Sequence, residues 1–409
     1  MTAEKPSVCR VVYEFLPRTG GSVTHTVELA KKINAHCRNQ FVIAPKMEGT
    51  EECDAALPFP VIRVKYPRFK LLGRLKRGRW FRWLPLQYLW VFSYGLCTVP
   101  EIIKLNREHG IDIIHVHGVY LGMSVAIASK LTGKPIVWMA HGAQDAYSEA
   151  EGRFETLATR LFSRVMPPDH LFVVEDGSPA PRKFTQVFPR RASVVYHSID
   201  SERFFPMPRD EKLVQHLGLK DADFVVQSAH TLIPIKGVEH AITAFKEFLN
   251  INTRSSAVLV IAGGGNERAS LERLVSDLGI SNRVKFLGPI SNSDMPRYYS
   301  ICDVGLATST YSNLNLSTQE TMACGKPVIA FDSGQTSLLI QNMDTGILVR
   351  SGDTQELAKQ LDHLYKNRTA AAAIGARAHD FIAKNRSWEN RVATELKVYD
   401  ELLSERGRG

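Results

Sequence analysis

The chain is organised around the stretch Ser309-Thr-Tyr-Ser-Asn-Leu-Asn-Leu-Ser-Thr-Gln-Glu-Thr-Met-Ala-Cys-Gly-Lys-Pro-Val-Ile329. Its pattern predicts a small polar loop, a short helix that carries Glu320, a stop at Gly325 and a buried strand from Pro327. The backbone N–H groups at the start of such a helix can bind an anion. A carboxylate one to two turns further along suits two hydroxyl groups, as on a ribose. The alternative interpretation is a polar loop that leads into an ordinary amphipathic helix.

Continuous apolar segments, typical of buried strands, alternate with helical segments along the whole chain. In the first half we predict strands at residues 8–15, 41–44, 61–64, 111–116, 136–140, 171–174 and 193–196, with a helix at 87–109. In the second half we predict strands at 224–227, 258–262, 284–287, 304–307, 328–331 and 347–349, and helices near 238–250, 267–279, 294–300, 317–324 and 354–366. The alternation predicts an α/β protein whose parallel sheets are covered by helices on both faces.

The length and composition favour a protein of two globular domains. The chain has 409 residues, of which 44% are hydrophobic and 23% are charged. Prolines and polar residues at 200–210 indicate a linker. We therefore predict two Rossmann-like domains at residues 1–203 and 204–386 that face a central cleft, with ligands at the carboxyl ends of the strands. A further helical region at 372–403 has a break at Trp388.

The excess positive charge is confined to one segment. Nine of the 51 Lys and Arg residues lie at 61–100, where there is no acidic residue, so the other 42 balance the 42 Asp and Glu residues of the chain. Aromatic residues are interspersed with these cations from Arg63 to Arg82. The mixture suits an anionic membrane surface, where each cation contributes about 1 kcal/mol. The alternative interpretation is a solvated loop. No recognition motif indicates a nucleic-acid partner.

The remaining features indicate a cytoplasmic protein that can lie on the inner face of the membrane. The six cysteines show no metal-ligand spacing, and the polar N-terminus shows no secretory signal. The apolar residues 83–99 are interrupted by Pro85, Gln87 and Gly95, so we predict a buried helix there rather than a membrane span. Residues 221–223 read Asp-Ala-Asp but precede a strand, which favours a turn; we expect no metal site.

In the first half, glycine or histidine follows three predicted strands, at Gly20-Gly21-Ser22, His117-Gly118 and His141-Gly142. The carboxyl ends of parallel strands share one edge, so these sites should converge. Paired glycines let the backbone approach a ligand closely, and His141 could orient or polarise a substrate hydroxyl. The alternative for each histidine is a structural side chain. We expect His115 to point to the opposite face from His117.

In the second half, three more candidate sites follow predicted strands. Lys236-Gly237 opens a helix, where a lysine can reach a diphosphate with help from the helix dipole. The run from Gly263 to Gly265 also precedes a helix, although it lacks the dinucleotide spacing. Backbone groups around Leu287 could bind a planar base.

The order of these motifs resembles the family 4 glycosyltransferases over essentially the whole chain. The matching segments are Gly20-Gly21, residues 112–118 (DIIHVHG), 139–142 (MAHG), Lys236-Gly237, 259–265 (LVIAGGG), 286–288 (FLG) and 320–330 (ETMACGKPVIA). The resemblance implies the GT-B fold, in which a last helix, here at about 387–409, crosses back onto the first domain. It also implies transfer of a sugar from a nucleotide donor, most often a UDP- or GDP-sugar, with retention at the anomeric carbon and without a separate cofactor.

The resemblance implies a role for individual residues. Gly21 approaches the donor phosphates or the reacting centre, and His141 contacts the donor sugar. Lys236 binds the diphosphate and Glu320 holds the ribose. Backbone amides of the donor loop, at Asn315, Leu316 and Ser317, hold the donor sugar and its distal phosphate.

Two positions depart from the family pattern. Thr231 stands where a phosphate-binding arginine is expected, and Ser312 replaces a glutamate that contacts the sugar hydroxyls. The leading hypothesis is a retaining glycosyltransferase that acts on a glycan or a lipid-linked saccharide. The alternatives are a non-catalytic sugar-nucleotide-binding homologue or partner subunit, and another GT-B activity such as an epimerase.

Overall fold

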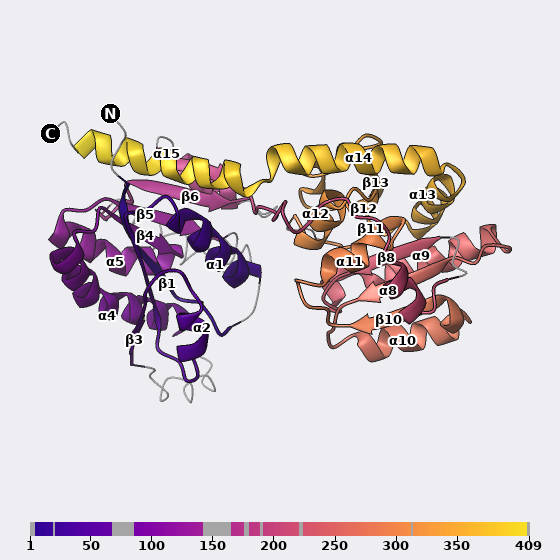
Figure 1. The fold of residues 1–409 in the computed structure, drawn as a ribbon, viewed down its shortest axis with the longest axis horizontal. Coiled ribbons are helices and arrows are strands. Elements are labelled where there is room, and N and C mark those ends of the chain that lie inside the picture. Colours follow the sequence, from indigo (N-terminus) through magenta and orange to yellow (C-terminus); the bar gives the residue numbers. More distant parts are fainter. Residues whose placement is uncertain are drawn as a thin grey trace, which may run out of the picture. The chain divides into compact units, whose positions relative to one another are not determined.

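A computed structural model describes residues 5–18, 21–67, 86–141, 165–175, 180–188, 191–220, 224–311 and 314–406 of the chain (Figure 1). The chain forms two compact units. The first comprises Met1–His197 and Glu389–Gly409, and the second comprises Ser198–Trp388.

The first unit is built on a seven-stranded parallel sheet in the order β3-β2-β1-β4-β5-β6-β7. The strands are β1 (Ser7–Val12), β2 (Asn39–Pro45), β3 (Val61–Val64), β4 (Ile113–His117), β5 (Ile136–Ala140), β6 (His170–Val174) and β7 (Ala192–Val195). The register places Arg10 beside His115 and Val12 beside His117. It also places His117 beside Met139. The carboxyl ends of β1, β4 and β5 therefore meet at one edge.

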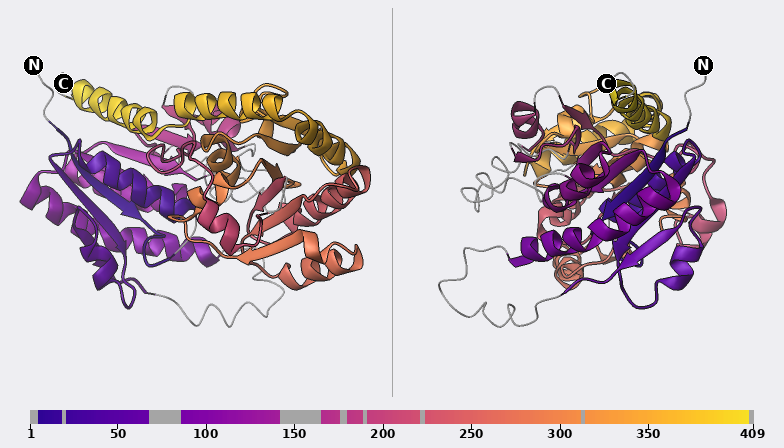
Figure 2. Two further views of the ribbon diagram at one scale, coloured as in Figure 1. Left: turned by 45° about the vertical axis from the view of Figure 1, so that its right-hand side comes forward. Right: turned by 90° about the vertical axis from the view of Figure 1, so that its left-hand side faces the viewer.

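Helices cover both faces of this sheet (Figure 2). They are α1 (Gly21–Asn34), α2 (Glu51–Ala55), α4 (Leu86–His109), α5 (Val119–Thr132), α7 (Ala180–Val187) and α15 (Trp388–Arg406). Alternate strand residues such as Cys9 and Val116 pack in one core with α4, α5 and α7. On the other face, Val12 packs with α1, and Arg10 contacts Glu395 of α15. The buried polar side chains of Arg10, Gln40, His115 and His117 lie on this second face.

The second unit is built on a six-stranded parallel sheet in the order β10-β9-β8-β11-β12-β13. The strands are β8 (Val225–Ala229), β9 (Val258–Ala262), β10 (Val284–Gly288), β11 (Val304–Ala307), β12 (Val328–Asp332) and β13 (Ile347–Arg350). The α-helices are α8 (Glu211–His216), α9 (Val238–Ile251), α10 (Arg268–Asp277), α11 (Met295–Ser300), α12 (Leu316–Ala323), α13 (Thr354–Lys366) and α14 (Arg368–Asn385). Short 3₁₀ turns are η4 (Pro234–Lys236), η5 (Ser281–Arg283) and η6 (Thr336–Leu338). One face of the sheet packs against α9, α10, α13 and α14, and the other packs against α8.

The predicted fold of two parallel α/β sheets is confirmed, and most strand bounds agree within two residues. The largest difference is the first strand, which ends at Val12 rather than at residue 15. The chain turns there, and the Arg18 N–H donates to the carbonyl of Phe15 at 3.2 Å. The predicted break near Trp388 separates α14 from α15. In the described part of the chain, no helix has the length and apolarity needed to span a bilayer.

Candidate active site

Helix α12 begins at the loop that the sequence singled out. Asn315 precedes its first residue, and Leu314 has a left-handed backbone with a φ of 47° although its side chain is buried. A non-glycine residue pays of order 1–3 kcal/mol for such a conformation. The amide of Gln319, one turn into the helix, donates to the Leu314 carbonyl at 2.8 Å and holds the loop. The conformation thereby presents the first N–H groups of α12, which can bind an anion.

Lys236 lies at the start of this helix in space. Its Nζ donates to Oδ1 of Asn315 at 2.5 Å, and the Asn315 amide donates to Oγ of Ser309 at 3.0 Å. Gly237 has a φ of 59° and lies against the carbonyl of Thr308, so a larger residue would not fit there. Burial lowers the pKa of Lys236. Two predicted donor-binding residues, 79 positions apart in the chain, are therefore in direct contact.

His230 is a site residue that sequence reasoning missed. Its ring is buried, and Nδ1 lies 3.1 Å from Oγ of Ser317. Burial and the nearby Lys236 cation lower the pKa of His230 to about 4, so the ring is neutral at pH 7. The next residue, Thr231, is exposed. The available signal was that His230 follows β8 directly, at the strand end where ligands bind in open α/β sheets.

The glycine run allows two loops to pass close together. Gly263 has a φ of 137°, and a Cβ on it would overlap the carbonyl of His230. A Cβ on Gly265 would overlap the carbonyl of Leu232. The backbone N–H groups of His230 and Leu232 donate to the carbonyls of Ala262 and Gly264 at 3.0 and 2.9 Å. Gly263 therefore allows the backbone at His230 to pack closely against it, and this contact positions His230.

Glu320 lies in the second turn of α12 and is half-buried. Its Oε2 accepts a hydrogen bond of 2.8 Å from the hydroxyl of Tyr299, which is fully buried on α11. Burial raises the pKa of Glu320, and the hydrogen bond from Tyr299 and the charge of Arg203 oppose this. The carboxylate is thus held at a defined position by a rigid donor. Ser312 lies outside the described residues, and Leu287 is half-buried against the core beside α8.

A small polar cavity of about 10 Å³ lies between the sheet and α12, which is room for about one water. Gln227, His230, Ser317 and Thr321 are among its lining residues. Within the described part of the chain, both amide atoms of Gln227 are buried without a hydrogen-bond partner. The side of α12 that lines this cavity is therefore polar, as is the N-terminus of the helix.

In the first unit, the structure brings two of the predicted strand-end histidines together. Nδ1 of His117 lies 3.0 Å from Nε2 of His141, and the rings stack with centroids 5.2 Å apart. Burial and the charges of His197 and Arg391 lower the pKa of His141 to about 3. Gly21 is the first residue of α1, whereas Gly20 lies outside the described residues. His141 is consequently a neutral ring at pH 7, held by a second ring.

The expectation that His115 and His117 point to opposite faces was wrong. Both side chains contact Nη1 of Arg10, at 3.4 Å for His115 Nδ1 and 3.2 Å for His117 Nε2, and their rings stack at 5.0 Å. Successive residues of a strand alternate between faces, so residues two apart share a face. His115 is fully buried and belongs to the same polar cluster as His117.

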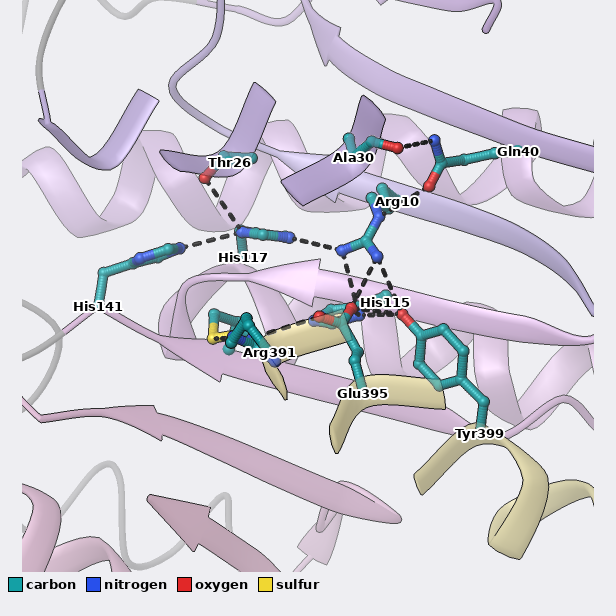
Figure 3. Close-up of polar contacts among 11 residues, drawn as sticks. Arg10, Thr26, Ala30, Gln40, His115, His117, His141, Arg391, Glu395 and Tyr399 are labelled. Carbon is teal, nitrogen blue, oxygen red and sulfur yellow. Dashed lines mark hydrogen bonds and ion pairs between the residues drawn. The ribbon is translucent and has the colours of Figure 1, made fainter. Parts of the chain in front are cut away.

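The cluster around Arg10 was not anticipated. Arg10 is fully buried in β1, and its Nη2 pairs with Oε1 of Glu395 at 2.6 Å. Figure 3 shows Arg10 between the histidines of β4 and the polar side chains of α15. The signal was present in the sequence, because Arg10 interrupts an apolar strand and arginine is almost never fully buried unless it is paired.

Comparison with known proteins places this geometry in context. Residues 209–385 match the model described as glycosyl transferases group 1, and residues 19–203 match the model described as glycosyltransferase family 4. D-inositol 3-phosphate glycosyltransferase of Salinispora tropica is 28% identical over 94% of this chain and 82% of its own. GDP-mannose-dependent alpha-(1-6)-phosphatidylinositol monomannoside mannosyltransferase of Mycobacterium tuberculosis is 28% identical over 94% of this chain and 96% of its own.

Solved structures share the fold. The crystal structure of Anabaena HepE in complex with UDP has a TM-score of 0.75 and 21% identity, covering 97% of this chain and 100% of that chain. A glycosyltransferase from Rickettsia africae has a TM-score of 0.75 and 17% identity, covering 97% of this chain and 99% of that chain. The two sheets have the GT-B architecture.

Proposed function

Because this chain belongs to the family 4 glycosyltransferases, we propose that it transfers a sugar from a UDP- or GDP-sugar to a saccharide hydroxyl with retention at the anomeric carbon. One observation carries the proposal. The Lys236 ammonium reaches Asn315 at the N-terminus of α12, at 2.5 Å. A cation and the first N–H groups of a helix together form a site for a diphosphate. Glu320, one turn further along, then faces the nucleoside end of the same ligand.

The chemical step follows from this arrangement. The bond between the anomeric carbon and the diphosphate oxygen breaks while the bond to the acceptor oxygen forms on the same face of the sugar. The proton of the acceptor hydroxyl passes to the departing phosphate oxygen. Lys236 and the N–H groups at Leu316 and Ser317 stabilise the charge that develops on the diphosphate. We propose that the transfer needs no divalent cation, since these groups already supply positive charge where it is required.

Glu320 is proposed to hold the ribose of the donor. Tyr299 donates to one carboxylate oxygen at 2.8 Å and fixes the orientation of the group. A carboxylate accepts hydrogen bonds only, which suits the two hydroxyls of a ribose. Burial raises the pKa of Glu320 and thus disfavours its charged form. Hydrogen bonds from the two ribose hydroxyls would oppose this effect, because they stabilise the carboxylate that accepts them.

We propose an anionic or lipid-linked acceptor. The names of the two relatives describe acceptors that carry phosphate, inositol 3-phosphate and phosphatidylinositol monomannoside. The basic segment of this chain supports the same class. Arg63, however, is paired with Asp54 through Nε at 2.8 Å, so the membrane hypothesis rests on the cations from Lys65 to Arg82. Residues 68–85 of this segment lie outside the described part of the chain.

The test is a thermal-shift panel of UDP-, GDP- and ADP-sugars, followed by measurement of nucleotide release and product analysis with the best donor. We expect a shift with one nucleotide class and release that depends on the acceptor, with and without EDTA. A shift without acceptor-dependent release would favour the non-catalytic binder, to which the replacements at Thr231 and Ser312 also point. Release with water as the acceptor would favour an epimerase-type activity. Flotation with anionic liposomes tests the membrane hypothesis, which fails if the protein does not bind them.

A further inference from the structure

A continuous chain of buried polar contacts leads from the last helix to His141 (Figure 3). Glu395 and Tyr399 of α15 contact Nη2 of Arg10 at 2.6 and 3.1 Å. Arg10 in turn contacts His117 through Nη1. His117 contacts His141, which lies immediately after β5. Residues from both ends of the chain therefore meet beside a candidate catalytic side chain.

The first link fixes the tautomer of His117. A guanidinium carries hydrogen on every nitrogen and only donates hydrogen bonds. Nε2 of His117, 3.2 Å from Nη1 of Arg10, must therefore accept. A neutral imidazole that accepts at one nitrogen carries its proton on the other. His117 thus carries its proton on Nδ1.

The contact between His117 and His141 in turn fixes the tautomer of His141. The protonated Nδ1 of His117 lies 3.0 Å from Nε2 of His141 and 3.4 Å from Oγ1 of Thr26. At 3.0 Å two N–H groups cannot face each other, so Nε2 of His141 accepts. His141 must then carry its proton on Nδ1, the nitrogen that does not face His117.

We propose that α15 sets the tautomer of His141 through Glu395, Arg10 and His117, and that these three are positioning residues for sugar transfer. His141 then acts toward a substrate oxygen as a hydrogen-bond donor at Nδ1. The catalytic part of this inference rests on the proposed function, whereas the tautomer itself does not.

The charges around the histidines favour neutral rings. Two buried guanidinium groups, those of Arg10 and Arg391, share the single carboxylate of Glu395, at 2.6 and 3.2 Å. A protonated histidine would add another buried cation beside them. The groups that bear on His117 and His141 are the charged Arg10, Arg391 and Glu395 and the imidazoles of His25, His115 and His197. Burial is the largest cause that lowers the pKa of both rings.

Glu395 and Tyr399 hold Arg10 in the position from which its Nη1 donates to Nε2 of His117. Gln40 contributes from the other side, because its Oε1 accepts from Nε of Arg10 at 3.1 Å and its amide donates to the Ala30 carbonyl at 2.8 Å. The guanidinium is therefore held by β2 and α15 together. A second arrangement of Arg10 would break at least one buried hydrogen bond.

The tautomer is tested by NMR on the whole protein labelled with ¹⁵N-histidine at pH 7. Two-bond ¹⁵N–¹H correlation spectra distinguish a protonated Nδ1 from a protonated Nε2, and His117→Gln and His141→Gln assign the two rings by loss of their signals. We expect both rings to carry the proton on Nδ1. A proton on Nε2 of His141, or a doubly protonated ring, would overturn the inference. This readout needs neither donor nor turnover, so it is independent of the proposed function.

The positioning role is tested with a matched pair at His117. Asparagine can place an amide near the Nδ1 position and still donate to His141, whereas glutamine places its amide near Nε2 and contacts only Arg10. With the best donor, we expect His117→Asn to keep kcat within about threefold and His117→Gln to lose about tenfold, the worth of one hydrogen bond, with KM for the donor little changed in both. Equal kcat losses in the two variants, at equal Tm, would contradict the role of the relay. A wild-type protein that turns over no donor would instead refute the proposed function.

Discussion

The buried carboxylate of Glu395 offers the sharpest test of how α15 is attached to the first unit. Its side chain is fully buried, and Oε1 contacts Arg10, His115 and Tyr399 at 2.6, 2.8 and 2.6 Å. Oε2 lies 3.2 Å from Nη2 of Arg391. Glu395→Ala would leave two buried guanidinium groups without a counter-ion. Removal of one partner from a buried pair costs about 3–5 kcal/mol, so we expect Glu395→Ala to lower the free energy of unfolding by about that amount.

The matched control lies on the same helix. Glu401 pairs with Lys397 at 3.9 Å, and both side chains are mostly exposed. Exposed pairs contribute about 0–1 kcal/mol, so Glu401→Ala should change stability little. Glu395→Gln keeps an oxygen that can accept from Arg10 while removing the charge, and we expect it to fall between the two.

The measurement is urea unfolding of the whole protein, monitored by both far- and near-UV circular dichroism. Coincident transitions in the two signals establish that unfolding is two-state. The pH dependence supplies a second check. Arg10, His115 and Arg391 hold the pKa of Glu395 well below its usual range. The stabilisation is therefore present above the unfolded-state pKa and is lost as the pH falls through the folded-state pKa. If Glu395→Ala unfolds at the same urea concentration as Glu401→Ala, the carboxylate does not hold α15 in the way described.

Three further predictions concern the second unit. Lys236→Met should reduce kcat by about 10²–10³-fold, the usual effect of losing one donor to a developing oxyanion; turnover within tenfold of wild type would contradict it. Glu320→Ala should abolish the thermal shift given by the nucleotide while leaving the ligand-free Tm within a few degrees, and a full shift would refute the ribose assignment. Gly263→Ala should lower stability by more than Gly279→Ala, by urea unfolding, because both glycines have a positive φ but only Gly263 would clash, with the His230 carbonyl. Equal losses would show that the two loops are not held together as described.

The sequence predicted both sheets because period and composition are local properties. Strands such as β5 (Ile136–Ala140) are unbroken apolar runs, and Gly325 stops α12 at the expected place. The stretch from Ser309 also indicated which helix end would present N–H groups. The sequence did not show which residue Lys236 contacts in the folded protein. Asn315 occupies that position only because β8 and β11 are neighbours in the sheet.

The error at His115 and the omission of His230 have different causes. The first was a mistake of period, since two strand residues separated by one share a face. The second arose because the position of His230 directly after β8 indicates only that it lies at a strand end and does not identify the residue that it contacts. Its contact with Ser317 depends on two strand ends being adjacent.

The sequence by itself determined the elements of this protein, their order and the residue types at the strand ends. Only the tertiary structure decided which of those residues touch. Arg10 and Glu395 are 385 positions apart and meet at 2.6 Å. No local pattern specifies such a pair, because burying either charge without the other is strongly destabilising and only the fold brings the two residues together.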